Sequence, residues 1–165
     1  LYTMWYSEDR SEDFIFSDPF VPNELYFFKL AAAEDVTFDE LSDLQGYNIG
    51  AVEEYTYTDE FWNSDLNIDL SNEESEIFRK LVAEEVDIVI ADRFVGQDIM
   101  NNELPNQVDD VEIIEIPLES LDQHVVFPIG VEGSEAFQVD FNESYSEMKA
   151  NGQLEKITNK YDFEF

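Results

Sequence analysis

The protein is a chain of 165 residues in which 40 Asp and Glu outnumber 8 Lys and Arg, giving a formal net charge of -32. Hydrophobic residues make up 44% and aromatic residues 15% of it, which is enough for a real core in one domain or two small lobes and excludes a disordered acidic tail. Nucleic acids and anionic membranes are poor partners for such a chain, because both bind through basic surfaces.

The acidic residues are dispersed along the chain with few lysines between them. Such a surface stays folded best where salt screens its self-repulsion, and we interpret it as adaptation to a saline setting, with a merely acidic protein as the alternative. The chain has no cysteine, so disulfides and thiolate metal sites are excluded. No stretch approaches the ~20 apolar residues that span a bilayer.

The first third of the chain predicts strands joined by turns and one short helix. Alternating aromatic and β-branched residues indicate strands in the aromatic opening and at 13–16, 24–30 and 47–52. Thr37-Phe-Asp-Glu40 has the form of a capping box that begins a helix, and Gly46 ends that helix. Gly50 lies inside the fourth expected strand and predicts a close approach by another part of the chain.

The middle third alternates helices and strands, the pattern of an α/β layer. Ser71-Asn-Glu-Glu74 has the form of a second capping box, and Val86 to Asp92 is a nearly continuous apolar run, typical of a strand covered on both faces. The expected helices are 58–62, the helix that follows Ser71, and 94–102; the other expected strands are 67–70 and 111–116.

The last third predicts a strand over 124–131 and a long helix capped by Ser134. Phe137, Phe141, Tyr145 and Met148 recur at helical spacing along one face of that helix. Gly152 ends it, and a final helix follows.

Four segments together resemble a known family. SEDRSEDFIFSDPF, TFDELSDLQGYNIGAV, VDIVIADRFVG and the closing stretch from VVFPIG to KITNKY occur in this order along the chain. They are similar to the extracellular solute-binding proteins of ABC importers, family 3, which bind polar amino acids. The resemblance implies an α/β fold of the periplasmic binding protein type II, with two lobes joined by two crossing strands and a ligand trapped between them.

The resemblance also implies a division of the chain. Residues 21–122 would form the second lobe, residues 1–20 and 123–165 the remainder of the first lobe, and the crossings would lie near 17–24 and 117–124. The family's opening half-lobe has no counterpart, so the first lobe is incomplete in this chain. Either the chain is a fragment of a longer protein, or something else must cover the exposed sheet.

An amino-acid ligand needs a cation for its carboxylate and an anion for its ammonium group. Arg10 falls on the family's carboxylate-binding arginine, and a guanidinium suits that task because it binds bidentately. The alternative is a surface arginine that bridges Glu8 or Asp13. Asp92 ends an apolar strand, where ligands of open α/β sheets bind, and it falls on the family's ammonium-binding aspartate. Its alternative role, which can coexist with the first, is to cap the helix that begins at Arg93.

The turn after the strand at 47–52 departs from the family. The family has a glycine and then Ser or Thr there, whose backbone N–H groups and hydroxyl meet the ligand carboxylate. Thr56 retains a hydroxyl, whereas Glu54 replaces the glycine and would repel a carboxylate. This departure disfavours an ordinary amino acid as the ligand.

The aromatic residues are a second departure from the pattern of the family. Trp5 stands where the family has Ser or Thr, and it can stack on a ring or cover a cation together with Tyr55 and other tyrosines. The alternative is that these residues only pack. Both departures favour a larger, cationic or aromatic ligand, such as a basic amino acid, an opine or a polyamine-like amine.

We therefore expect a solute-binding receptor with no enzymatic activity, cofactor or metal, whose partners are a small amine or amino acid and an ABC permease. It would act in the periplasm or outside the cell, held at the membrane by the permease. A ligand-sensing domain of a signalling protein is the alternative, and an enzyme on the same scaffold is a third. Catalysis has little support, because the one histidine, His124, lies in an expected strand beside no nucleophile or metal-ligand spacing.

Overall fold

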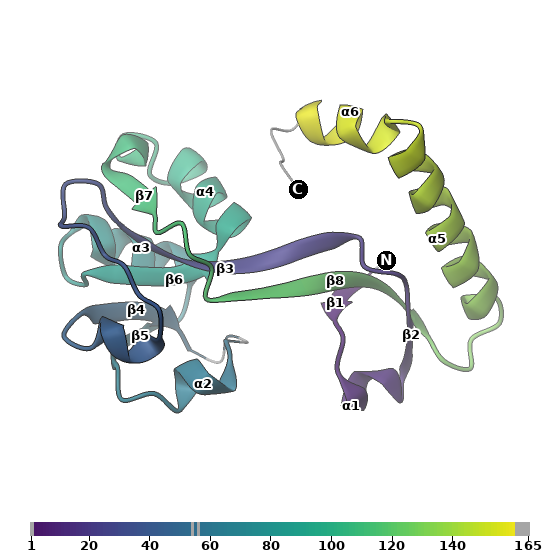
Figure 1. Ribbon diagram of the computed structural model, residues 1–165, viewed down its shortest axis with the longest axis horizontal. Helices are drawn as coiled ribbons and strands as arrows, with labels where there is room; N and C mark the ends of the chain where they lie inside the picture. The colour runs from purple at the N-terminus through teal and green to yellow at the C-terminus, as the bar shows by residue number, and fades with distance from the viewer. Residues whose placement is uncertain (1, 54, 56, 161–165) are drawn as a thin grey trace. The chain divides into compact units, whose positions relative to one another are not determined.

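The computed structural model describes residues 2–53, 55 and 57–160. The chain divides into two compact units, unit 1 from Leu1–Asn23 and Leu121–Phe165 and unit 2 from Glu24–Ser120 (Figure 1). Two long strands, β3 (Val21–Leu30) and β8 (Glu119–Pro128), each have residues in both units. No helix in the part of the chain described is long and apolar enough to cross a membrane.

Unit 2 is a mixed α/β layer. Its central strand β4 (Asn48–Val52) pairs in parallel with β5 (Asn67–Ser71) on one side and with β6 (Ile88–Asp92) on the other. On the far side of β6, β3 pairs antiparallel with β6 and with β7 (Val111–Ile113). The helical elements are the 3-10 turns Leu41–Leu44 and Val108–Asp110 and the helices α2 (Asp59–Trp62), α3 (Glu74–Val82) and α4 (Arg93–Asn102).

Two hydrophobic clusters cover the two faces of this sheet. Along β6, Ile88 and Ile90 belong to one cluster and Val89 and Ala91 to the other, and β3 alternates in the same way. All of the β6 residues are buried. The prediction of a strand covered on both faces is therefore confirmed for residues 88–92.

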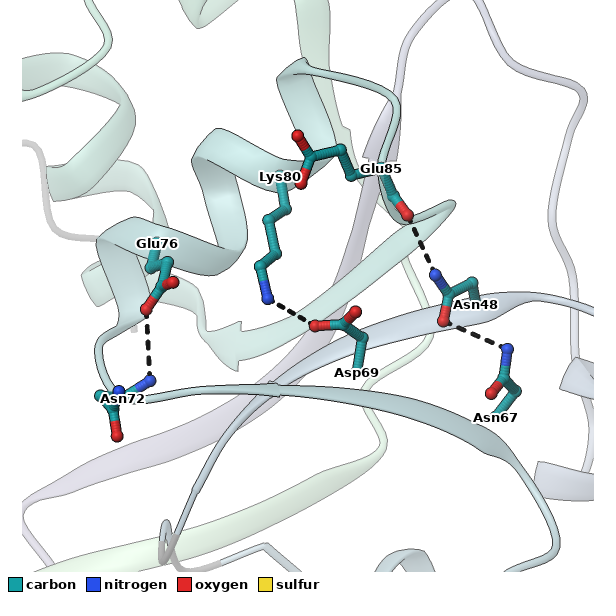
Figure 2. A network of polar contacts seen from close by, with 7 residues as sticks. All are labelled: Asn48, Asn67, Asp69, Asn72, Glu76, Lys80 and Glu85. Atoms are coloured by element: carbon teal, nitrogen blue, oxygen red, sulfur yellow. Dashed lines mark hydrogen bonds and ion pairs between the residues drawn. The ribbon is translucent and has the colours of Figure 1, made fainter.

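Several separate polar contacts near α3 link that helix and its end to the sheet (Figure 2). Lys80 Nζ lies 2.5 Å from Asp69 Oδ1 on β5. Asn48 Nδ2 on β4 donates to the carbonyl of Glu85 just beyond the helix, at 3.0 Å, and Asn67 Nδ2 donates to Asn48 Oδ1 at 3.2 Å. These bonds hold the amino ends of β4 and β5 in register with the end of α3.

Several predicted element boundaries are wrong, among them the strand expected over 124–131, which the structure places at Glu119–Pro128 (β8). The helix expected after Thr37 is a short 3-10 turn, and its capping box joins Glu40 to Asp43. Ser71 does not cap α3, because it extends β5 by pairing with Val52, and the helix begins at Glu74. The expected strand at 111–116 ends at Ile113.

Unit 1 consists of an antiparallel sheet and of helices that follow its strands. Its strand β8 pairs with β1 (Tyr2–Trp5) and with β2 (Phe14–Phe16). A short helix α1 (Glu8–Ser11) joins β1 to β2, and the helices α5 (Ser134–Ala150) and α6 (Gln153–Lys160) follow β8. Gly133, not Ser134, is the residue that caps α5.

One face of helix α5 contacts the end of β2 and the segment that follows it. Gln138 Nε2 donates to the carbonyl of Phe16 at 3.1 Å, and the Tyr145 hydroxyl donates to the carbonyl of Phe20. The ring of Phe141 stacks with that of Tyr145 at 6.0 Å between centroids. The expected apolar stripe therefore makes contact only in part, because Phe137 is 62% exposed.

Replacing Gly96 with alanine is expected to destabilise the protein by about 1–3 kcal/mol, the usual cost of overpacking. A Cβ at this position would lie 2.9 Å from Phe28 Cε1 and 2.9 Å from Phe78 Cζ, in the interior of unit 2. Alanine forms helices better than glycine by about 1 kcal/mol, so the clash reverses the usual sign. Urea unfolding followed by circular dichroism measures the loss.

The matched control is Gln97→Ala on the exposed side of the same helix, which is expected to leave the urea midpoint unchanged. A Gly96→Ala protein as stable as the wild type would show that the two rings can move apart at no cost.

Candidate ligand-binding site

The carboxyl edge of the parallel strands in unit 2 brings two predicted site residues together. Strands β4, β5 and β6 all end at this edge. Asp92 is the last residue of β6, and Tyr55 follows β4 by three residues. Side chains at the carboxyl ends of parallel strands form the usual ligand-binding edge of α/β sheets.

Asp92 caps helix α4. Its Oδ1 accepts hydrogen bonds from the backbone N–H groups of Phe94 and Val95, each at 2.9 Å. The carboxylate is 6% exposed. The capping role considered for this residue is therefore present, and it holds the carboxylate in one orientation at the edge of the sheet.

Tyr55 lies within the electrostatic reach of Asp92. The pKa of Tyr55 is raised to about 12, first by burial and then by the negative charges of Asp92 and Glu74. Its ring is 4.8 Å from that of Tyr57, centroid to centroid. A half-buried phenol whose pKa is raised by two carboxylates as well as by burial indicates negative charge near this edge.

Tyr57, two residues after Tyr55, has a structural role. Its hydroxyl accepts a hydrogen bond from the N–H of Val52 at 3.0 Å and donates to the carbonyl of Ile90 at 3.3 Å. The side chain is buried, and burial is the main cause of its raised pKa. Tyr57 therefore links β4 to β6 just below the candidate site.

The basic side chains of unit 2 are engaged elsewhere. Arg79 Nη2 pairs with Glu103 at 2.6 Å, Lys80 pairs with Asp69, and buried Lys29 pairs with Glu112 at 2.6 Å. Arg93 follows Asp92 directly, but its guanidinium lies over the ring of Tyr26, 5.6 Å from the centroid.

The guanidinium of Arg93 is thus engaged with an aromatic ring. Tyr26 in turn donates a hydrogen bond from its hydroxyl to Glu24 Oε2 at 3.0 Å. The carboxyl edge of unit 2 is consequently acidic, which favours a positively charged ligand group there.

Arg10 and Trp5 come together in unit 1. Ser7 caps the short helix α1 by accepting from the N–H of Arg10 at 3.2 Å, and Arg10 Nη1 donates to the carbonyl of Trp5 at 3.1 Å. In the described residues Arg10 forms no ion pair with Glu8 or Asp13, so the surface bridge considered for it is absent.

Trp5 is held by a polar pair that the sequence analysis missed. Its indole Nε1 donates to Asn23 Oδ1 at 2.8 Å, and Gln123 Nε2 donates to the same oxygen at 3.2 Å. Asn23 is 8% exposed. An asparagine near the start of a strand that is mostly apolar is the one signal that could have identified this partner.

The predicted site residues belong to different units or lie outside the described part of the chain. Arg10 and Trp5 belong to unit 1, whereas Asp92 and Tyr55 belong to unit 2. Thr56 and Glu54 are outside the described residues. His124 Nδ1 lies 2.7 Å from the carbonyl oxygen of Ser17, a structural role consistent with its lack of a catalytic neighbour.

The sequence matches no family model and no curated protein, whereas many solved structures match the fold. A mutant of ArgBP from T. maritima is 18% identical over 95% of this chain and 65% of that chain, with a TM-score of 0.68. A substrate-binding domain of a putative amino acid ABC transporter from Streptococcus pneumoniae is 19% identical over 96% and 69%, with a TM-score of 0.67.

A histidine kinase sensor domain with similarity to periplasmic binding proteins is 17% identical over 96% of this chain and 67% of that chain, with a TM-score of 0.66. The fold is that of the type II periplasmic binding proteins. These neighbours are binding and sensor proteins rather than enzymes. This chain spans only about two thirds of the length of each, and the first lobe of the fold is incomplete in it.

Alkaline pH is expected to destabilise the wild-type protein more than the Tyr55→Phe variant. The pKa of Tyr55 is about 12 in the folded protein and about 10 in an unfolded chain. Because the folded value is the higher one, the contribution of Tyr55 to stability is complete below pH 10 and is lost as the pH rises toward 12. Thermal unfolding measured at a series of pH values across this window tests the difference.

The control is Tyr6→Phe, which changes an exposed tyrosine of unit 1 and is expected to follow the wild-type curve. If Tyr55→Phe loses as much stability as the wild type over this range, the phenol of Tyr55 does not lie in the acidic environment described above.

Proposed function

We propose that this protein is a solute-binding receptor that captures a small amino-acid-like or cationic ligand. The observation that carries the proposal is the acidic edge of unit 2, where Asp92 and Tyr55 meet at the carboxyl ends of parallel strands in a type II periplasmic binding fold. An oriented carboxylate beside an aromatic ring suits an ammonium or guanidinium group, through a charge-assisted hydrogen bond and a cation–π contact.

The assignment of Arg10 as the partner of a ligand carboxylate is part of the same proposal. Ser7 and the carbonyl of Trp5 hold this arginine by its backbone and by one guanidinium nitrogen, which leaves it further N–H donors for an anion. Trp5 and Thr56 are further ligand contacts in the same proposal.

Import by an ABC permease is the role we propose for the ligand complex, outside the cell or in the periplasm. It is supported by the likeness to the substrate-binding domain of a putative amino acid ABC transporter and to ArgBP, which has also been solved with arginine bound. The second candidate is a ligand-sensing domain of a signalling protein, favoured by the likeness to a histidine kinase sensor domain. Both roles use the same ligand-binding site. They differ in the partner protein that recognises the ligand-bound form.

Asp92→Ser is expected to weaken ligand binding with little loss of stability. Serine caps helices about as well as aspartate but carries no charge, so the variant keeps α4 and removes the anion. Loss of a charge-assisted hydrogen bond predicts an affinity lower by about 10- to 100-fold. The measurement is a thermal-shift screen in high salt against basic amino acids, opines, amines and glutamate, followed by calorimetric titration of the best ligand.

Asp98→Ser is the matched control, because Asp98 is an exposed aspartate of the same helix that only accepts a bond from Asn102. Arg10→Lys is expected to weaken carboxylate-bearing ligands and to leave simple amines unaffected. If no compound raises the melting temperature of the wild-type protein, the assignment of this chain to amino-acid or amine binding must be withdrawn.

A further inference from the structure

Helix α3 begins at the edge of unit 2 that carries the candidate site. The helix leads from β5 to β6, which both run parallel to β4, so it runs back along the sheet from the carboxyl ends of the strands. Ile77 lies over β4, because a Cβ on Gly50 would be 3.3 Å from Ile77 Cβ. Glu74 is the first residue of α3. It lies about 4.5 Å further along the helix axis than Ile77, at a rise of ~1.5 Å per residue, which brings it to the carboxyl edge.

The carboxylate of Glu74 is uncommitted in the described part of the chain. Glu74 is half-buried, and among the described residues its side chain has no ion pair or hydrogen bond. The start of the helix does not need it, since Glu76 Oε2 accepts from the N–H of Asn72 at 3.4 Å (Figure 2). Its charge reaches the phenol of Tyr55 and helps to raise the pKa of that group, after burial and Asp92. Two carboxylates thus act on one phenol.

Ser71 supplies a second, independent observation at this edge. It is the last residue of β5 and pairs with Val52, the last residue of β4. Paired residues of neighbouring strands share a face of the sheet, so Ser71 lies on the face that Val52 shares with Ile77 of α3. Ser71 is only 5% exposed, and its hydroxyl has no hydrogen-bond partner among the described residues. Buried polar groups are nearly always paired, so this hydroxyl indicates a partner from outside those residues.

Ser71 and Glu74 have the sequence spacing of a capping box but do not form one. In a capping box the serine hydroxyl accepts from a backbone N–H of the first helical turn, and the glutamate accepts from the N–H of the serine. Here the cap position is Glu73, which makes no side-chain bond to the helix, and pairing with Val52 keeps Ser71 in β5. Two polar groups that the local sequence could have joined are therefore left at the edge that carries Asp92.

We propose that Glu74 and Ser71 form a second cation subsite at the same edge as Asp92, so that the ligand of this protein carries two positively charged groups. The inference rests on the proposed function, in which Asp92 binds the first of these groups. A ligand with a single cation would leave one of two carboxylates uncompensated in a partly buried site, which is unfavourable. A second ammonium or guanidinium group compensates Glu74 through a charge-assisted hydrogen bond and offers an N–H to the hydroxyl of Ser71. The ligand class is therefore a basic amino acid or a diamine.

The test uses two pairs of compounds whose members differ in one positive charge. L-Arginine is compared with L-citrulline, which has the same length and an uncharged side chain, and putrescine is compared with butylamine, which lacks the second amine. Binding of each compound to the wild-type protein is measured by calorimetric titration at one salt concentration. We expect at least one doubly charged compound to bind about 10- to 100-fold more tightly than its singly charged partner, the value of a charge-assisted hydrogen bond.

Two substitutions assign this preference to the second subsite. Glu74→Gln is expected to abolish it, by weakening the doubly charged compound far more than its singly charged partner. Ser71→Ala is expected to weaken the doubly charged compound by about two- to tenfold, the net value of one hydrogen bond. The melting temperature of the unliganded Ser71→Ala protein is expected to be unchanged or higher, because the variant loses an unpaired buried hydroxyl.

Glu73→Gln is the matched control. Glu73 is an exposed carboxylate directly before Glu74 and makes no capping bond. The variant therefore removes the same charge from the start of α3 and is expected to keep the preference for the doubly charged compound.

The second subsite is contradicted if singly and doubly charged compounds bind the wild-type protein equally, or if Glu74→Gln weakens both members of a pair by the same factor. It is also contradicted if Glu73→Gln abolishes the preference, since the preference would then come from the general negative field of the protein. In these cases the compounds still bind, so the proposed function stands and only the second subsite is withdrawn. If none of the compounds binds, the second subsite is withdrawn as well, and the proposed function is judged by its own wider screen.

Discussion

The parallel pairing of β4 with β6 is the constraint on which the candidate site depends. It places the ends of both strands at one edge of unit 2, and the hydroxyl of Tyr57 joins them there by bonding Val52 N–H and the Ile90 carbonyl. Both strands are buried on their two faces, so their register cannot slip without moving core residues into the wrong cluster. This register brings Tyr55 and Asp92 to the same edge of the sheet.

Much of unit 2 could be predicted from the sequence, because its signals are local and agree with one another. The apolar run that ends in Asp92 predicted a strand covered on both faces, and residues 88–92 form one. Gly50 predicted a close approach, and a Cβ there would lie 2.9 Å from Val89 Cγ1. The capping role of Asp92 was also among the predictions, because an aspartate directly before a helix is a strong local signal.

The errors arise where a contact distant in the sequence overrides a local signal. Ser71 has the spacing of a helix cap, but pairing with Val52 keeps it in β5, and its hydroxyl has no hydrogen-bond partner in the described part of the chain. The expected stripe of α5 included Phe137, yet that side chain is 62% exposed in the described part of the chain. The partner of Trp5 is Asn23, 18 residues away, and no periodicity or motif connects two such positions. Contacts of this kind become visible only when the strands have been placed in space.

The capping of α4 explains how so acidic a protein can bury the carboxylate of Asp92. An anion that is 6% exposed is costly to bury unless its charge is compensated. The two N–H groups at the start of α4 supply part of that compensation, through hydrogen bonds and the positive end of the helix dipole. They also fix the orientation of the carboxylate before any ligand arrives, which reduces the entropy that binding must lose. Under the proposed function, a positively charged ligand group would meet an anion that α4 has already oriented, close to the phenol of Tyr55.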